Sequence, residues 1–395
     1  MSRSFSCVLV TGARQVGKST LLRSLMPEGM KYITLDDYRL AKQAKEDPIG
    51  FLELYAPPLC IDEVQYAPEL LRAIKLKVDA EPRRKGMYWL TGSQRFHLMQ
   101  GISESLAGRI GILDMSTFSQ SEIGGLAMYE KPFCCELKAL QERAQRAHIC
   151  SINELYERIW RGGYPALVCD PALKVEKYFS AYLQTYLERD VQSLQQVGDR
   201  GAFLALMKSA AARTGQQLVY SDIARDADVS VNTAKRWISI LETSGIIALL
   251  EPYYVNTTKR LVKSPKLYFM DTGFCAWLGG WSTPKVLMEG ALSGNILETW
   301  VYGQLYRSFN NHGIMPRLSY FRNSNGAEVD FIIEQDGCIY PLEVKRSSSP
   351  ILSDLKGVQS IPPGKSTIMP GIVLCTALEM LPLGKGNYAY PISAL

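Results

Sequence analysis

The stretch GARQVGKST at residues 12–20 decides the fold of the N-terminal part of the chain. It fits the pattern G-x-x-x-x-G-K-[ST], follows the apolar run Cys7–Val10 and opens a predicted helix over Lys18–Leu25. Glycines let the backbone curl so that several N–H groups face one anion, and the helix N-terminus adds a positive dipole. The spacing therefore predicts a phosphate-binding loop. A chance match is the alternative, and the strand before and the helix after the motif argue against it.

Nucleotide contacts are expected along the whole loop. The predicted binding residues are Gly12, Ala13, Arg14, Gln15, Val16, Gly17, Lys18, Ser19 and Thr20. Lys18 would reach the β- and γ-phosphates, and Ser19 would hold Mg²⁺.

A second apolar run, Leu59–Ile61, ends in two acids. We expect this strand to deliver Asp62 beside the phosphate loop, where its carboxylate orients the magnesium shell with Ser19. Glu63 would polarise the attacking water. An ordinary strand ending in two solvated acids is the alternative, and the phosphate loop upstream disfavours it.

A third strand-like run, Tyr88–Thr91, ends in hydroxyl residues. Thr91 or Ser93 is a candidate contact for the γ-phosphate or the water, and a plain strand end is the alternative. Arg109 is a candidate for supplying transition-state charge, in its own chain or to a neighbouring subunit, as arginine fingers do. The alternative for Arg109 is a surface arginine.

Composition bounds the remaining possibilities. The chain has 395 residues, of which 47% are hydrophobic and 21% charged, with a net charge of +5. This usage excludes a disordered, collagen-like or small disulfide-rich protein and permits nucleic-acid binding without requiring it. The nine cysteines form no CxxC pair and there are only three histidines, so no zinc site is expected. Neither a signal peptide nor a long apolar run is found, which predicts a cytoplasmic protein without a membrane partner.

The order of apolar and helical stretches predicts an α/β chain in three parts. Residues 1–150 alternate strands and helices, as in a parallel α/β ATPase domain with a phosphate loop. Residues 151–284 are expected to form a helical linker, broken at WRGGYP (160–165), and a winged helix-turn-helix. Residues 285–395 start with a helix and continue with strands, which predicts a C-terminal α/β domain, and its acidic residues resemble those of a nuclease-like domain.

The winged unit is expected from the stretch SDIARDADVSVNTAKRWI at residues 221–238, in which Ser230 would cap the second helix. Residues 201–270 carry nine Lys and Arg against five Asp and Glu, a local net charge of +4. DNA contact is one interpretation, and a winged helix that only packs beside the nucleotide domain is the other. The candidate DNA contacts are Asn232, Thr233, Lys235 and Arg236 on the second helix and Lys259, Arg260 and Lys263 on the hairpin, with Lys266 in the same basic run.

A second set of chemistry-bearing residues lies in the C-terminal part. Asp330 starts one strand, while Glu343 and Lys345 lie two residues apart on the next and so share a face. Glu298 lies on the preceding helix. This order resembles the active sites of the restriction-endonuclease-like fold, which predicts that Glu298, Asp330, Glu343 and Lys345 form a metal-dependent phosphodiesterase site. Acids and lysines on an exposed β-surface are the alternative.

Taken together, the motifs resemble one family. TGARQVGKST (11–20), YITLDD (32–37), CIDEVQYAPELLRAIK (60–75), LTGSQ (90–94), SLAGR (105–109), WRGGYPAL (160–167), TYLERDV (185–191), FRNSNGAEVDFII (321–333) and PLEVK (341–345) occur in this order. The chain thus resembles the bacterial and archaeal AAA-type ATPases with a C-terminal DUF4143 domain. In that family a short helical segment usually precedes the first strand, whereas this chain starts almost at the strand.

The resemblance implies an ATP-binding protein, a Mg²⁺-dependent ATPase that uses hydrolysis as a conformational switch. ATP and Mg²⁺ are the expected cofactors. Two alternatives stay open: an ATP-gated, metal-dependent DNA nuclease, and a nucleotide-controlled protein-binding module without cleavage activity. Duplex DNA or a protein is therefore the expected partner, and a homo-oligomer is required if Arg109 acts on a neighbouring subunit.

Overall fold

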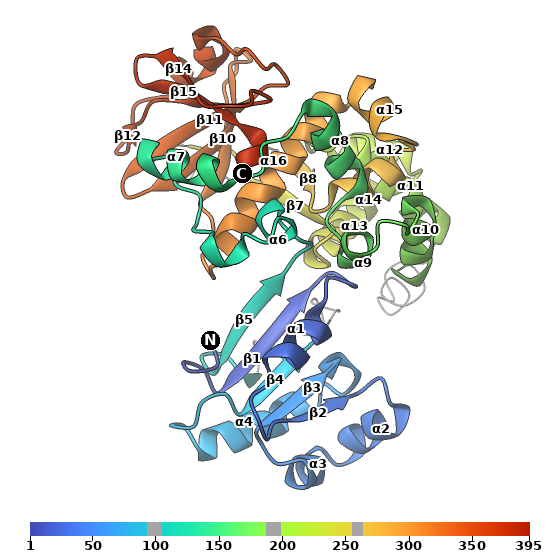
Figure 1. The fold of residues 1–395 in the computed structure, drawn as a ribbon. Coiled ribbons are helices and arrows are strands. Elements are labelled where there is room, and N and C mark those ends of the chain that lie inside the picture. The colour runs from blue at the N-terminus through green and yellow to red at the C-terminus, as the bar shows by residue number, and fades with distance from the viewer. Residues whose placement is uncertain (93–104, 187–198, 255–263) are drawn as a thin grey trace. The chain divides into compact units, whose positions relative to one another are not determined.

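The computed structural model describes residues 1–92, 105–186, 199–254 and 264–395 (Figure 1). The chain forms two compact units. Unit 1 consists of residues 1–116 and 243–245, and unit 2 of residues 117–242 and 246–395. Several residues singled out in the sequence lie outside the described residues, namely Ser93, Lys259, Arg260 and Lys263, and so does most of the motif TYLERDV.

Unit 1 is built on a five-stranded parallel sheet with the strand order β2-β3-β4-β1-β5. The strands are β1 (Cys7–Gly12), β2 (Lys31–Thr34), β3 (Leu59–Asp62), β4 (Tyr88–Thr91) and β5 (Ile110–Met115). Strand β4 lies between β1 and β3, so its carboxyl end separates the end of β1 from that of β3. The predicted parallel α/β fold is therefore confirmed.

Helices cover both faces of this sheet. They are α1 (Lys18–Leu25), α2 (Tyr38–Glu46), α3 (Pro48–Leu54) and α4 (Leu70–Ala80), with a 3₁₀ turn, η1 (Val64–Tyr66). Because successive strand residues point to opposite faces, Cys7 and Leu9 pack into the cluster with α2, α3 and α4. Val8 and Val10 pack with Leu22 of α1 on the other face. Apolar strands buried on both faces explain the continuous apolar runs in the sequence.

Unit 2 begins with helices. They are α6 (Gln120–Ile123), η2 (Ala127–Tyr129), α7 (Leu137–Arg146), α8 (Ile152–Arg161), α9 (Pro165–Cys169), α10 (Val175–Tyr186) and α11 (Arg200–Ala211). Helix α8 ends where WRGGYP was expected to break it, because Gly162 adopts a non-helical φ of +78°. A side chain is also excluded at this position, since a Cβ there would lie 2.4 Å from an oxygen of Asp271.

A helix pair and a small sheet follow. Helix α12 (Tyr220–Asp226) and α13 (Val231–Thr243) are joined by a short turn, and the Ser230 side chain accepts a hydrogen bond from the Thr233 N–H at 3.1 Å. The antiparallel sheet has the order β6-β8-β7. Its strands are β6 (Gln216–Gln217), β7 (Ile247–Leu250) and β8 (Lys266–Phe269).

The C-terminal part combines helices with a mixed sheet, the predicted second α/β layer. Helices α14 (Thr272–Leu278), α15 (Pro284–Glu289) and the long α16 (Ser293–Asn310) precede it. The sheet order is β14-β15-β13-β11-β10-β9, with β12 paired to β11. Its strands are β9 (Leu318–Arg322), β10 (Glu328–Gln335), β11 (Cys338–Val344), β12 (Thr367–Ile368), β13 (Ile372–Cys375), β14 (Leu381–Gly384) and β15 (Asn387–Pro391), accompanied by η5 (Leu352–Ser360) and η6 (Ile392–Ala394).

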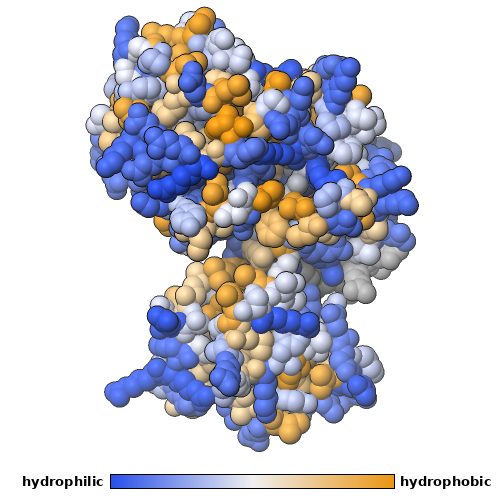
Figure 2. Space-filling view, in the orientation of Figure 1, coloured by the Kyte–Doolittle hydropathy of each residue, from blue (hydrophilic) through white to orange (hydrophobic). Residues whose placement is uncertain are grey.

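The surface is mostly polar on the face drawn in Figure 2, where α7 forms a hydrophilic patch. Among the described helices, none is both long and apolar enough to cross a membrane. The nine cysteines are all free thiols. Burial raises the pKa of Cys7 and of Cys60 to about 12, so these two thiols stay protonated and behave as core residues.

Candidate functional site

The backbone of the phosphate loop has the turns that its glycines allow. Gly12, Gln15 and Gly17 all have positive φ, at 135°, 60° and 96°. A Cβ on Gly12 would lie 2.0 Å from the carbonyl oxygen of Met115, so no other residue fits there. Gly17 is the N-cap of α1 and provides no capping side chain, which leaves the first N–H groups of this helix to an anion.

Side chains of the loop divide into packed and exposed ones. Val16 is fully buried and Ala13 nearly so, whereas Gln15 and Thr20 are exposed and Arg14 is half-buried. Lys18 is buried, and its ammonium group donates to the carbonyl oxygens of Gly12 and Ala13 at 3.1 and 2.7 Å. The lysine thus lies along the inside of the loop, where the phosphate oxygens of a bound nucleotide would compete with these carbonyl oxygens for its N–H donors.

The carboxylate of Asp62 connects the other polar side chains of the site. It accepts a hydrogen bond from the Ser19 hydroxyl at 2.9 Å and others from the hydroxyls of Tyr32 and Thr91. Strands β3 and β4 end at Asp62 and Thr91, and α1 starts beside Ser19, so parallel strand ends and a helix start meet at one edge of the sheet. The residues predicted from separate motifs lie together.

Glu63 lies just beyond β3 in the left-handed region, at φ 58°. Its N–H donates to the Thr91 hydroxyl at 3.0 Å, and the amide of Gln65 donates to its carboxylate. A non-glycine residue in this region is uncommon and points to a functional constraint. Thr91 therefore holds both acids through one hydroxyl, which is a role in positioning them.

Tyr32 is a site residue that the motif analysis did not single out. It lies on β2, and its hydroxyl donates to the second carboxylate oxygen of Asp62. The guanidinium of Arg23, on α1, lies 4.1 Å from the centre of the tyrosine ring. Burial and the bond to Asp62 raise the pKa of Tyr32 to about 12, so the hydroxyl keeps its proton and remains a donor. The only sequence signal was its place at the start of YITLDD.

Arg109 is not brought to the phosphate loop of its own chain. It precedes β5, which runs parallel to β1 with Ile110 beside Cys7, whereas the loop follows the opposite end of β1. Its guanidinium forms an ion pair with Asp79 at the end of α4. Arg109 thus lies at the amino-terminal end of the strands, opposite the end that carries the phosphate loop. This register argues against action of Arg109 on a nucleotide bound to its own chain.

The predicted DNA contacts on α13 lie on its outer face. Asn232, Lys235 and Arg236 are exposed and Thr233 is half-buried. The opposite face packs Ala234, Trp237, Ile238 and Leu241 into the core. The three hairpin residues Lys259, Arg260 and Lys263 lie outside the described residues. Lys266 corrects the sequence interpretation: it is only 2% exposed and is not part of a basic surface.

The four C-terminal residues converge, and the structure adds three more to them. The ammonium of Lys266 lies 2.8 Å from Glu298, 2.5 Å from Glu328 and 3.8 Å from Asp330. The Tyr268 hydroxyl donates to Glu298 at 2.5 Å. Lys345 pairs with Glu343 at 2.6 Å, and Asp330 accepts the Val344 N–H at 2.8 Å. Sequence reasoning missed Lys266, Tyr268 and Glu328, because Lys266 and Tyr268 lie on β8, in the unit expected to bind DNA.

The electrostatics of this cluster follow from burial and an excess of acids. Burial and then repulsion from Asp330 raise the pKa of Glu298 to about 7. The same two causes raise the pKa of Glu343 to about 8. Burial alone would lower the pKa of Lys266, but the surrounding carboxylates outweigh it and raise that pKa above its ordinary value. Lys266 therefore stays charged, whereas Glu298 and Glu343 keep their protons to a higher pH than exposed glutamates do.

The two predicted metal sites differ in how well their donors fit. At the phosphate loop, the Ser19 hydroxyl and the Asp62 carboxylate lie 2.9 Å apart, which is the donor pair expected for Mg²⁺. In the C-terminal cluster the ammonium of Lys266 lies between the carboxylates. Within the described part of the chain, no group of three or more acid, cysteine or histidine side chains is arranged to hold a metal ion. The donors of this cluster do not fit the predicted divalent metal.

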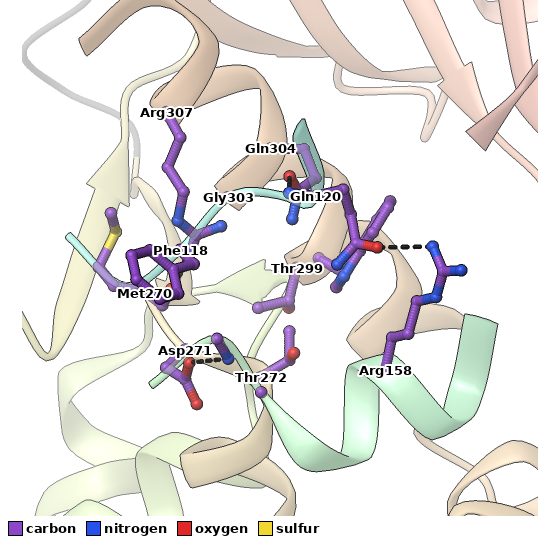
Figure 3. Close-up of a pocket in the computed structure, with 13 residues that line it drawn as sticks. Phe118, Gln120, Arg158, Met270, Asp271, Thr272, Thr299, Gly303, Gln304 and Arg307 are labelled. Carbon is purple, nitrogen blue, oxygen red and sulfur yellow. Dashed lines mark hydrogen bonds between the residues drawn. The ribbon is translucent and has the colours of Figure 1, made fainter. Parts of the chain in front are cut away.

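A buried polar pocket lies where α8, α14 and α16 meet (Figure 3). Asp271 accepts hydrogen bonds from the N–H groups of Gly163 and Phe274 at 2.8 and 2.9 Å, so one carboxylate ties the WRGGYP turn to the start of α14. Arg307 donates to the Thr117 hydroxyl at 2.8 Å, and among the described residues its Nε has no hydrogen-bond partner. The free volume is about 10 Å³, room for about one water molecule. The pocket is structural.

A larger hollow of about 780 Å³ lies elsewhere in unit 2. Its walls combine apolar side chains, such as Ile123 and Tyr129, with cationic ones, such as Lys131 and Arg146. Arg143 in the same wall is already paired with Glu130 at 3.2 Å. Of the predicted site residues that the structure describes, none lines this hollow.

Comparison with known proteins agrees with this geometry. A strand–loop–helix that leaves N–H groups, a lysine and a hydroxyl–carboxylate pair at one sheet edge defines a P-loop nucleotide-binding domain. The model of the AAA domain family matches residues 4–124, and that of the domain of unknown function DUF4143 matches residues 293–395. A further domain of unknown function, DUF8612, matches residues 152–285. The AAA-domain and DUF4143 matches support the resemblance that the motifs indicated, an AAA-type ATPase with a C-terminal DUF4143 domain.

Relatives and solved structures add little about activity. Uncharacterized proteins of Mycobacterium bovis and Mycobacterium tuberculosis are each 29% identical over 353 residues, which cover 88% of this chain and 71% of theirs. A RuvB variant of Thermotoga maritima is 14% identical with a TM-score of 0.28, over 62% of this chain and 82% of that one. The Aeropyrum pernix ORC1 protein in complex with DNA is 16% identical with a TM-score of 0.25, over 67% and 83%. Likenesses this weak carry no functional argument.

Proposed function

We propose that the chain is a Mg²⁺-dependent ATPase that uses hydrolysis as a conformational switch. The observation that carries this proposal is the convergence of Lys18, Ser19, Asp62 and Glu63 at one sheet edge. A AAA domain match over the same residues supports it. Among the described residues of this edge, the polar groups are those that phosphoryl transfer to water requires.

Each side chain has a distinct task in this proposal. Lys18 exchanges its bonds to the loop carbonyls for phosphate oxygens and stabilises the charge that develops there. Bound Mg²⁺ would supply Lewis-acid polarisation of the phosphate, held by Ser19 and oriented by Asp62. Glu63 orients the attacking water, and Thr91 fixes Glu63 through its backbone N–H at 3.0 Å.

The test is ATP turnover of the purified chain in Mg²⁺ against Lys18→Ala. A matched control is Lys42→Ala, because Lys42 is an exposed lysine on α2 of the same unit. Wild type and Lys42→Ala should turn over ATP at the same rate, while Lys18→Ala falls to background. Equal phosphate release by all three proteins would refute the proposal.

DNA association is a second candidate function. The exposed polar face of α13, with Asn232, Lys235 and Arg236, supports it, since a helix that follows a tight turn suits a DNA groove. Winged-helix packing beside the ATPase domain, or a protein partner under nucleotide control, is the competing proposal. If duplex DNA is bound, affinity should fall steeply with salt and Lys235→Ala with Arg236→Ala should weaken it. If the chain binds no DNA at low salt, DNA association is refuted and a protein partner is favoured.

An ATP-gated nuclease receives less support. Its four residues lie together, but a metal-dependent site needs open oxygen ligands, and the ammonium of Lys266 occupies the side of Glu298 and Asp330. Nicking of plasmid DNA in Mn²⁺ that Asp330→Ala abolishes would be needed to restore this function.

A further inference from the structure

We infer that Lys266 is the resident cation of the C-terminal carboxylate cluster, which makes this cluster a metal-free ion-pair site joining strand β8 to the C-terminal domain. The inference does not depend on the proposed ATPase activity. It replaces the metal expected from the sequence with a side chain of the chain itself.

The contacts of Lys266 resemble those of a bound cation. An ammonium group has three N–H donors and no acceptor. Two carboxylate oxygens, from Glu298 and Glu328, lie at 2.8 and 2.5 Å, and one from Asp330 lies at 3.8 Å. The side chain is 3% exposed, so water contributes little to its solvation. The acids are therefore what stabilises the buried charge.

The carboxylates also have partners other than Lys266. The second oxygen of Asp330 accepts the Val344 N–H, and the Glu298 oxygen that contacts Lys266 also accepts the Tyr268 hydroxyl. Glu343 is held by Lys345 at 2.6 Å. A magnesium ion requires about six oxygens at roughly 2.1 Å in an octahedron, and it would be repelled by an ammonium group at this position. Metal binding would require Lys266 to leave.

The position of Lys266 in the chain gives the cluster a structural consequence. Lys266 pairs along the backbone with Gln217 of β6 and Leu250 of β7, within the three-stranded sheet. Its side chain crosses to α16 and β10, which belong to the DUF4143 match, whereas β8 belongs to the DUF8612 match. Without Lys266, the acids Glu298, Glu328 and Asp330 would lose their common counter-charge, so this lysine holds the two matched regions together.

Metal binding in solution tests the inference directly. Mn²⁺ is titrated, without nucleotide, into an Asp62→Ala background that removes the phosphate-loop site, and bound ion is measured by electron paramagnetic resonance. This background should show no bound Mn²⁺. Adding Lys266→Met should create one Mn²⁺ site per chain, since the open acids are then the ligands. Adding Asp330→Asn as well should abolish that site.

The opposite results would overturn the inference. If the Asp62→Ala protein binds one Mn²⁺ and Asp330→Asn removes it, the cluster is a metal site after all. If a folded Lys266→Met protein gains no Mn²⁺, Lys266 is not what excludes the ion. Should Lys266→Met fail to fold, the comparison of Asp62→Ala with and without Asp330→Asn still decides. Lys208→Met, an exposed lysine on α11, is the control for loss of a charge.

Discussion

Replacing Glu298 by glutamine is expected to remove much of the pH dependence of stability in unit 2. Burial, with repulsion from Asp330, raises the pKa of Glu298 from 4.5 to about 7 although Lys266 and Tyr268 both donate to it. An acid whose pKa is higher in the folded chain takes up a proton on folding. The folded state is therefore favoured at low pH, and stability falls as pH rises from 4.5 to 7.

The size of the effect follows from the shift. One pKa unit corresponds to about 1.4 kcal/mol. Deprotonation of Glu298 alone should therefore lower the free energy of unfolding by about 3 kcal/mol as the pH rises from 4.5 through 7. Glutamine resembles the protonated acid, keeps an acceptor for Lys266 and carries no charge. Glu298→Gln should therefore be close to the wild type at pH 5 and more stable than it at pH 8, by roughly 2–3 kcal/mol. In melting temperature this is on the order of 6 °C.

Unfolding followed by tryptophan fluorescence between pH 5 and pH 8.5 is the assay. Of the six tryptophans only Trp89 lies in unit 1, so the signal reports chiefly on unit 2. Some slope should remain in the variant, because the pKa of Glu343 is also raised, to about 8. A wild type whose stability rises with pH, or a variant with the same slope as the wild type, would show that the cluster does not hold a proton and would refute the reasoning.

Three further predictions concern other parts of the chain. Tyr32→Phe should raise the Mg²⁺ concentration for half-maximal ATP turnover roughly tenfold, because Asp62 loses the donor that orients it; unchanged Mg²⁺ dependence would argue against that role. Gly162→Ala should lower the stability of unit 2 by about 2–4 kcal/mol, through its positive φ and the close carboxylate, and a neutral result in denaturant unfolding would contradict this. Arg109→Ala should leave ATP affinity unchanged, since Arg109 pairs with Asp79 away from the loop, and turnover that falls only as oligomers form would indicate action on a neighbouring subunit.

The parts of the site that lie in one local motif could be predicted from the sequence. The phosphate loop is a strand, a glycine turn and a helix in succession, so its geometry follows from contiguous residues. Asp62 and Glu63 were predicted because they end an apolar strand, and parallel strand ends share an edge. The α/β class and the AAA-type family followed from the same patterns, and both are confirmed.

Residues whose partners are remote in the chain could not be assigned in this way. Lys266 belonged to a basic run that looked like a DNA surface, yet its side chain points into the core and meets acids on α16 and β10. Arg109 looked like an arginine finger, yet the strand register puts it at the end of the strands opposite the phosphate loop. A charged side chain carries no sequence signal for burial until its counter-charge is known.

The sequence by itself therefore determined the strand–loop–helix of the phosphate loop and the α/β class. Local propensity, glycine geometry and apolar periodicity suffice for these, since they act between near neighbours. Only the tertiary structure decided which charges meet. Tyr32 is tied to Asp62, Asp271 to the WRGGYP turn, and Lys266 to three carboxylates. Electrostatic energy depends on distance and burial in space, and neither can be read along the chain.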